Sequence, residues 1–276
     1  MNLEPDYDGP VSLDRLAGDW KIYQLQRGHR FSADDMFTAW MATRVAPNAL
    51  SLCDLGAGIG SVGLMAMWKM QPEATLLAVE AQAVSHRLMR RTVAFNGLGA
   101  RVALRLGDLR DVGVVPEHDV FDLVTGSPPY IPLGKGVVSP VAQRAACRME
   151  LRGTIADYAA TAARIMQPNG WFVACFAAAD PRGVAGIAAA GLHLRVRQDI
   201  VFRGNQAPLI SLFAATRVAG DFDHRAPFPI RGKDGEWTAV YHDLREEMGT
   251  KLGRLAGPSR DPAAQSPRPV SRHSTH

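Results

Sequence analysis

Short apolar segments alternate along this chain with longer segments of helical period, and this alternation restricts the fold more than any other feature. Between two of them, Val84, Leu88 and Phe95 recur at helical spacing, and Asn96-Gly97 follows as a left-handed helix end requires. Such alternation is typical of βαβ units around a parallel sheet. With 276 residues, 47% of them hydrophobic, the chain can bury the core of one large domain. The segments expected to form parallel strands are residues 50–55, 75–80, 101–106, 121–125 and 171–176.

The last two apolar segments, residues 192–202 and 209–216, have no helical segment between them. Parallel strands need a long crossover, so these two are expected to pair antiparallel at one edge of the sheet. The predicted architecture is therefore a Rossmann-like α/β fold whose mostly parallel, seven-stranded sheet ends in an antiparallel hairpin.

The two ends of the chain differ from its middle. Residues 20–25 and the turn Arg27-Gly28-His29-Arg30 predict a hairpin, and a helix is expected over residues 33–45. From Gly257 onward the residues are mostly Pro, Ser, Ala and Arg, which predicts a disordered tail. We therefore divide the chain into a hairpin and helix over residues 1–46 that cover the ligand site, a main domain over residues 47–245, and a C-terminal extension over residues 246–276.

A glycine-rich loop, Asp54-Leu55-Gly56-Ala57-Gly58-Ile59-Gly60, follows the first strand of the parallel sheet. Gly56 and Gly58 let the backbone pass close beneath a ligand, and Gly60 eases packing of the next helix on the strand. The main alternative is a dinucleotide site, but the G-x-G-x-x-G spacing fails because Gly60 comes too early. Asp54 would also repel a pyrophosphate, whereas it suits the ammonium group of an amino-acid ligand, directly or through water.

Two more carboxylates follow the next two strands. Glu80 ends one strand, where a carboxylate can accept both ribose hydroxyls of a nucleoside, and Asp108 follows the other, where it can accept the exocyclic amine of adenine. The carboxyl ends of parallel strands share one edge, so these side chains and Asp54 should face the same crevice. Each carboxylate alone is explained equally well as a surface charge, but together with the glycine loop they predict S-adenosylmethionine binding.

The tetrapeptide Ser127-Pro128-Pro129-Tyr130 follows the strand at residues 121–125. Two prolines end the strand and remove two N–H donors, which leaves a rigid turn with free carbonyl acceptors. Such a turn suits a planar NH2 group. The Ser127 hydroxyl and the Pro128 carbonyl would accept its hydrogens and return electron density to the nitrogen, while Tyr130 stacks on the ring. The alternative for Tyr130 is a core aromatic that caps the sheet.

Composition limits which other kinds of protein this chain could be. A net charge of +4 is compatible with a polyanionic partner but does not indicate one. The three cysteines are expected to be reduced thiols, and the eight histidines lack the spacing of a metal site. No stretch is long and apolar enough to span a membrane, and no signal peptide is recognisable, so a cytoplasmic location is expected.

In these motifs the chain resembles the class I S-adenosylmethionine-dependent methyltransferases. Within them it is similar to the bacterial family that methylates the exocyclic amine of an adenine beside the tRNA anticodon. The resemblance covers about residues 12–245 and is also carried by residues 12–18 and 27–34. It implies the class I methyltransferase fold, S-adenosylmethionine as methyl donor, and an RNA substrate, in the first place tRNA.

The resemblance also implies three groups of site residues. The catalytic group is Ser127, Pro128, Pro129 and Tyr130. The cofactor-binding group is Arg30, Phe31, Ser32, Asp54, Gly56, Ala57, Gly58, Gly60, Glu80, Ala81, Asp108, Leu109 and Ser127, of which residues 30–32 would close the methionine end. The substrate-binding group is Arg27, His29, Lys135, Arg144 and Arg148. The last two are four residues apart, so on a helix they would share one face toward phosphates; a solvated basic face paired with Glu150 is the alternative.

Ser127 departs from this family, which usually has Asn at that position. Serine is more usual in DNA methyltransferases that act on the exocyclic amine of cytosine, and its hydroxyl is a shorter acceptor. A glutamine amide of a protein, a DNA cytosine and a small-molecule amine therefore stay open as substrates. A non-catalytic module that binds the cofactor or RNA is the alternative from another class. Unstacked anticodon-loop bases favour RNA over duplex DNA.

Overall fold

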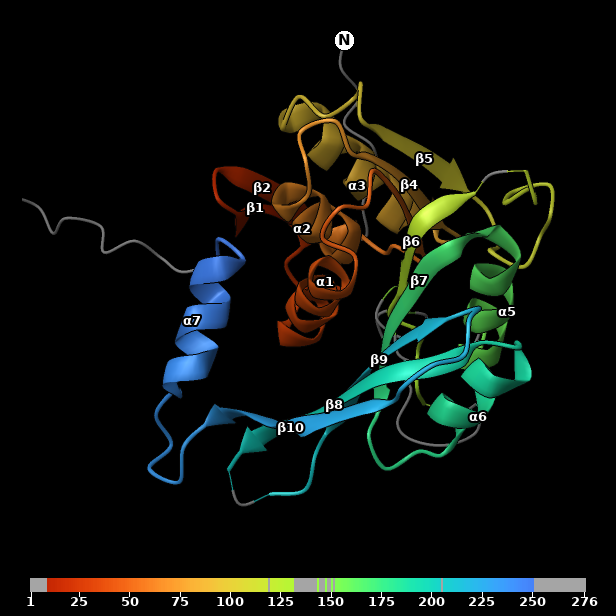
Figure 1. Cartoon of the computed structure of the whole chain (residues 1–276). Helices are drawn as coiled ribbons and strands as arrows, with labels where there is room; N and C mark the ends of the chain where they lie inside the picture. The colour runs from red at the N-terminus through yellow and green to blue at the C-terminus, as the bar shows by residue number, and fades with distance from the viewer. Residues whose placement is uncertain are drawn as a thin grey trace, which may run out of the picture.

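The computed structural model describes residues 9–118, 120–131, 143, 147, 150, 152–204 and 206–250. An eight-stranded sheet in the order β10-β8-β9-β7-β6-β3-β4-β5 runs through the molecule (Figure 1). All neighbouring strands pair in parallel except β9, which is antiparallel to both β7 and β8. The predicted Rossmann-like architecture is thereby confirmed. The strands are β3 (Ser51–Leu55), β4 (Thr75–Glu80), β5 (Val102–Leu106), β6 (Phe121–Gly126), β7 (Met166–Ala177), β8 (His193–Arg203), β9 (Ile210–Thr216) and β10 (Asp223–Arg231).

One edge of the sheet differs from the prediction. The expected antiparallel pair, β8 and β9, is present, but β10 lies outside it and pairs in parallel with β8, so the described sheet has one strand more than the seven expected. No strand was predicted at β10, because it contains Pro227 and Pro229 and prolines argue against a strand. An edge strand tolerates them, since one side of its backbone needs no ladder partner. The register of β10 shifts between Arg225 and Phe228, around Pro227.

The N-terminal hairpin is also present, with its turn in a different place. β1 (Val11–Ala17) and β2 (Trp20–Leu25) form a separate antiparallel pair. Their turn is at Gly18 and Asp19, where Gly18 has a φ of +54° and lies against the Trp68 indole. The turn expected at Arg27–Arg30 instead connects β2 to the first helix. The Gly18 N–H also donates to the Gly249 carbonyl at 3.0 Å, which ties the hairpin to the C-terminal end of the described chain.

Helices cover both faces of the sheet (Figure 1). On one face the core contains residues of the first three helices together with Leu76 and Ala78 of β4; on the other it contains residues of α5 and α6 with Leu77 and Val79. This alternation along a single strand is that of a sheet buried on both sides. No helix in the described ranges is long and apolar enough to cross a membrane. The helices are α1 (Ala33–Val45), α2 (Ser61–Lys69), α3 (Ala83–Phe95), α5 (Ile155–Ile165), α6 (Arg182–Ala189) and α7 (Ala239–Glu247).

α7 packs beside α1 (Figure 1). Its Tyr241 ring stacks on Phe37 of α1 with 5.9 Å between centroids, and its Glu247 accepts a hydrogen bond from the Trp40 indole at 3.1 Å. Three predicted substrate-binding residues, Lys135, Arg144 and Arg148, lie outside the described residues. So does the tail expected to be disordered from residue 257.

Candidate functional site

A cavity opens at the edge of the sheet where β3, β4, β5 and β6 end, and we call it the first cavity. Together with the open solvent at its mouth it holds about 780 Å³ of empty space. Ligands of open α/β sheets bind at this edge. The structure thus brings together, from four separate strands, the glycine loop, Glu80, Ala81, Leu109, Ser127 and Pro129.

The three glycines of the loop have different surroundings. Gly56 and Gly58 have positive φ angles of +61° and +58°, a conformation that favours glycine. A Cβ atom on Gly58 would meet no atom within 4 Å, because this residue faces the open cavity, whereas one on Gly56 would collide with the Tyr158 hydroxyl. Gly60, also predicted to bind the cofactor, does not line this cavity. It precedes α2 with a φ of +92° and packs against Met89.

Glu80 is fixed by the backbone around it. Its carboxylate is 5% exposed and accepts the Gly58 N–H at 2.8 Å and the Gln82 N–H at 2.6 Å. Burial raises the pKa of Glu80, while these N–H groups favour its charged form. Two carboxylate oxygens offer about four acceptor sites. Glu80 therefore ties the glycine loop to β4 and still has acceptor capacity for ligand hydroxyls.

Asp54 and Asp35 add two more buried carboxyl groups to the same cavity. Asp54 accepts the Thr125 hydroxyl at 2.8 Å and the Gly63 N–H at 2.9 Å, and burial raises its pKa to about 7. Asp35 accepts the Ser32 N–H at 2.9 Å in the first turn of α1, and burial raises its pKa to about 6. Such a cluster favours a cationic ligand, which would restore the ionised forms.

Asp108 has a different position from the one predicted. Its side chain is 35% exposed, and both its oxygens accept bonds from the Arg110 guanidinium, at 2.6 and 2.9 Å. This pair lowers the pKa of Asp108. Its neighbours Gly107 and Leu109 line the first cavity, but Asp108 does not. The predicted contact with an adenine amine in this cavity would therefore require the Asp108 side chain to change its position.

A second cavity lies on the other side of the Pro-Pro turn and contains Pro128, Tyr130 and Asp34. It shares Ser127 and His29 with the first cavity, as well as Asp35 and Cys147. The turn after β6 therefore stands where the two cavities meet.

Tyr130 is held at the wall of the second cavity and remains 37% exposed, which contradicts the alternative of a core aromatic. Its ring contacts Phe176 edge-on, with centroids 6.1 Å apart, and its hydroxyl donates to Asp34 at 3.5 Å. Burial raises the pKa of Asp34, and the Tyr130 hydroxyl opposes this shift. Behind Ser127, the Cys175 thiol donates to the serine hydroxyl oxygen at 3.6 Å.

Residues 30–32, which were expected to close over the methionine end of the cofactor, do not lie at one place in the structure. Arg30 lines the second cavity and pairs with Asp14 of β1 at 3.1 Å, and Ser32 precedes α1 at the same cavity. Phe31 lines neither cavity, because its apolar ring packs against the hydrophobic core. Arg27 is exposed and also lines neither one. Arg30 and Ser32 therefore lie at the second cavity rather than at the glycine loop.

Several cavity residues were not predicted. Tyr158 of α5 is buried under the glycine loop, and its ring lies where a Cβ on Gly126 would approach within 2.7 Å. The sequence signal was the pair Gly56 and Gly126, which lie at the ends of the adjacent strands β3 and β6 and leave room for one large ring. Burial raises the pKa of both Cys147 and Cys175 to about 12, so neither thiol is activated. Asp35, Ser61 and Gln82 also line this cavity without having been predicted.

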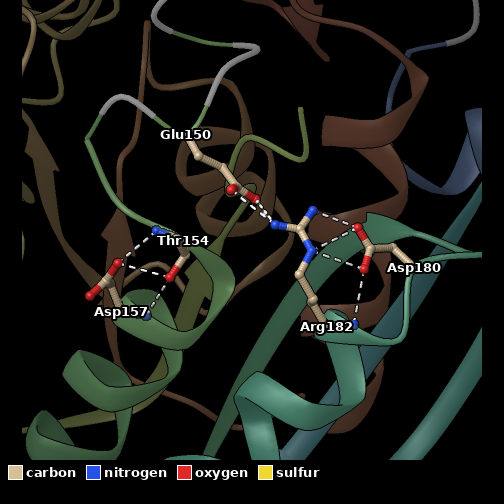
Figure 2. A network of polar contacts seen from close by, with 5 residues as sticks. All are labelled: Glu150, Thr154, Asp157, Asp180 and Arg182. Atoms are coloured by element: carbon tan, nitrogen blue, oxygen red, sulfur yellow. Dashed lines mark hydrogen bonds and ion pairs between the residues drawn. The ribbon is translucent and has the colours of Figure 1, made fainter. Parts of the chain in front are cut away.

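A polar network connects Glu150, Arg182 and Asp180 (Figure 2). The Arg182 guanidinium donates to Glu150 at 2.7 and 2.9 Å and to Asp180 at 3.0 Å. It also lies 5.6 Å from the centroid of the Phe176 ring, the ring that Tyr130 contacts. Glu150 further donates its N–H to the Ile131 carbonyl at 3.0 Å. In the described structure Glu150 thus pairs with Arg182.

The same view shows how α5 begins (Figure 2). The Thr154 N–H donates to Asp157 at 2.7 Å, and the Asp157 N–H donates back to the Thr154 hydroxyl at 3.4 Å. This capping box fixes the helix that carries Tyr158. Among the residues that the structure describes, no cluster of three or more His, Cys, Asp or Glu could hold a metal ion.

No protein-family model matches the chain. In sequence it is similar to two bacterial proteins named tRNA1(Val) (adenine(37)-N6)-methyltransferase. It is 26% identical to that of Cronobacter sakazakii over 210 residues, which cover 75% of this chain and 82% of the relative. It is 28% identical to that of Citrobacter koseri over 203 residues, which cover 71% and 78%. The resemblance inferred from the motifs is confirmed by this similarity.

Solved structures show the fold. A predicted O-methyltransferase from Agrobacterium tumefaciens matches with a TM-score of 0.59 and 21% identity over 80% of this chain and all of that one. The 16S rRNA N2 G1207 methyltransferase of T. thermophilus, solved with AdoMet and guanosine, matches with a TM-score of 0.54 and 16% identity over 76% of this chain and 50% of that one. The chain therefore has the class I methyltransferase fold.

Proposed function

We propose that this chain transfers a methyl group from S-adenosylmethionine to the exocyclic amine of an adenine in tRNA. The observation that carries the proposal is the meeting of two cavities at Ser127, one bordered by the glycine loop and Glu80 and the other by Tyr130. A methyl donor and an acceptor amine must meet at such a boundary. The curated relatives, named for methylation of adenine 37 of a tRNA, support the choice of substrate.

The first cavity fits the methyl donor. Its buried carboxyl groups suit a ligand that carries an ammonium and a sulfonium, and the open space above Gly58 can take the ligand close to the backbone. Glu80 would hold the ribose hydroxyls, Asp54 the ammonium group, and Leu109 would contact the adenine ring. When bound, S-adenosylmethionine supplies an electrophilic methyl group.

The second cavity would place the acceptor amine. The Ser127 hydroxyl and the Pro128 carbonyl would accept its two hydrogens, which favours pyramidal nitrogen, and Tyr130 would stack on the base. No strong base is required, because the product ammonium is acidic and loses its proton to water. Catalysis would then rest mainly on positioning. A tRNA substrate also implies a cytoplasmic location.

The test is incubation of the protein with methyl-labelled S-adenosylmethionine and separate tRNA, ribosomal RNA, DNA and protein fractions. We expect label in tRNA, recovered as N6-methyladenosine after digestion to nucleosides. Label confined to protein would contradict an RNA substrate, and cofactor binding without transfer to any fraction would indicate a non-catalytic module. Because Ser127 also suits a cytosine amine, recovery of N4-methylcytosine from DNA would move the proposal to that base.

A further inference from the structure

A third cavity adjoins the second and has no part in the chemistry described so far. It shares Ser32 and Asp34 with the second cavity and extends between α1 and the strands β8, β9 and β10. Its outer wall is formed by Phe202, Leu209, Arg231 and Trp237. We propose that this cavity binds the nucleobase next to the target base in a single-stranded RNA segment, an inference that rests on the function proposed above.

The wall of the third cavity carries exposed apolar side chains. Phe202 is 43% exposed, Leu209 62% and Trp237 37%. Unstacked RNA bases bind proteins by stacking on exposed aromatic rings of this kind. Continuity with the second cavity places this surface where the strand must pass when its neighbouring nucleotide enters beside Tyr130.

The Trp237 ring is held in place although it is exposed, because it contacts the Tyr241 ring edge-on with 5.6 Å between centroids and its backbone is fixed. Trp237 forms an antiparallel bridge with Arg231 of β10. The next residue, Thr238, donates its N–H to the Ile230 carbonyl at 3.0 Å and its hydroxyl to the Pro229 carbonyl at 2.7 Å, and it caps α7. A ring fixed in advance loses little conformational freedom when a base stacks on it.

Two guanidinium groups accompany the rings. Arg231 lies 5.9 Å from the Phe202 centroid and 5.7 Å from that of Trp237, and Arg245 lies 4.3 Å from Trp237. Both donate to backbone carbonyls, Arg231 to Gly235 at 2.6 Å and Arg245 to Thr250 at 3.1 Å. Neither is paired with a carboxylate within the described ranges. Their charge is thus available to the phosphates of a bound strand, which favours a nucleic acid over an uncharged peptide.

The experiment compares three synthetic RNA stem-loops with an unpaired target adenine: one intact, one with an abasic site 5′ of the target and one with an abasic site 3′ of it. On the intact RNA, Trp237→Ala should raise KM about tenfold, as expected for one lost base stack, while kcat and cofactor affinity change little. Trp237→Phe should retain most of the affinity. One of the two abasic RNAs should raise KM for the unmodified protein similarly and show no further loss with Trp237→Ala.

An equal loss with Trp237→Ala on all three RNAs would overturn the proposal, as would a lowered KM, which would mean that another segment occupies the cavity. If Trp237→Ala fails to fold, Phe202→Ala carries the same comparison. Phe222→Ala is the matched control, because this ring is 53% exposed but lies outside the cavity. Absence of RNA methylation by the unmodified protein would refute the proposed function itself; methylation with unchanged KM in both variants would refute only the third cavity.

Discussion

The two cavities that meet at Ser127 are built in different ways. In the first cavity, the proposed cofactor half, Glu80 and Asp54 are buried and held by backbone N–H groups of Gly58, Gln82 and Gly63. In the second cavity, the proposed substrate half, Tyr130 is partly exposed and is held by side chains from distant parts of the chain. The first half is thus set by strand ends and loop geometry, whereas the second depends on packing that no local motif encodes.

The largest effect should come from the substrate half. Tyr130→Ala removes the ring proposed to stack on the base, so kcat should fall about 100-fold or more, as expected when a reacting group loses its position. The dissociation constant for S-adenosylmethionine, measured by calorimetry, should change little, because Tyr130 does not line the first cavity. Tyr130→Phe is the control: it keeps the ring and loses only the hydroxyl that donates to Asp34. Equal loss of cofactor binding and turnover would show that the two halves are not independent.

The cofactor half should respond in the opposite way. In Glu80→Gln an NH2 group replaces one oxygen and faces a backbone N–H of Gly58 or Gln82. Loss of a charged hydrogen-bond acceptor should raise the dissociation constant for S-adenosylmethionine about 10- to 100-fold, with a smaller effect on kcat at saturating cofactor. Glu73→Gln is a matched control, because Glu73 is exposed before the opposite end of β4. Unchanged affinity in Glu80→Gln would remove this residue from the ribose site.

This contrast also explains what the sequence could predict. Glu80, Asp54, Gly58 and Leu109 were placed at the first cavity because topology alone brings strand ends together. Local motifs gave no indication that Arg110 pairs with Asp108, since that bond depends on side-chain conformation.

Other differences have equally specific causes. β10 was missed because its prolines argue against a strand, and Phe31 was assigned to the cofactor although its ring packs in the core. Asp35 lies in the first turn of α1, and its burial at the first cavity depends on how α1 packs. The sequence alone does not show whether a carboxylate in the first turn of a helix is buried or solvated.

The pH dependence of cofactor binding tests the buried charge of the first half. Asp54 has its pKa raised to about 7, so the folded protein holds a proton that the unfolded chain releases near pH 4. The free energy of unfolding without ligand should therefore fall as pH rises between about 4 and 7. The proposed contact with the ammonium of the cofactor requires an ionised Asp54, so affinity should rise up to about tenfold from pH 6 to pH 8.

Asp54→Asn should flatten both profiles, which calorimetric titrations and thermal melts at several pH values would measure. Asp122→Asn is the control, because Asp122 is a carboxylate at the opposite end of β6 that does not line the first cavity. A cofactor affinity independent of pH in the unmodified protein would mean that Asp54 is not the group that meets the ammonium.

The smallest effect concerns the connection of the substrate half to the rest of the molecule. Arg182 pairs with Glu150 and Asp180 (Figure 2). Its guanidinium also lies against the Phe176 ring that Tyr130 contacts. Arg182→Lys keeps the charge but loses the planar fork, so kcat should fall about threefold, as expected for a weakened cation–π contact. In a Tyr130→Ala background the same change should cost nothing more, because coupled residues are not additive. A full additional loss in that background would show that Arg182 affects turnover independently of Tyr130, and that the position of this ring does not depend on the distant side chain.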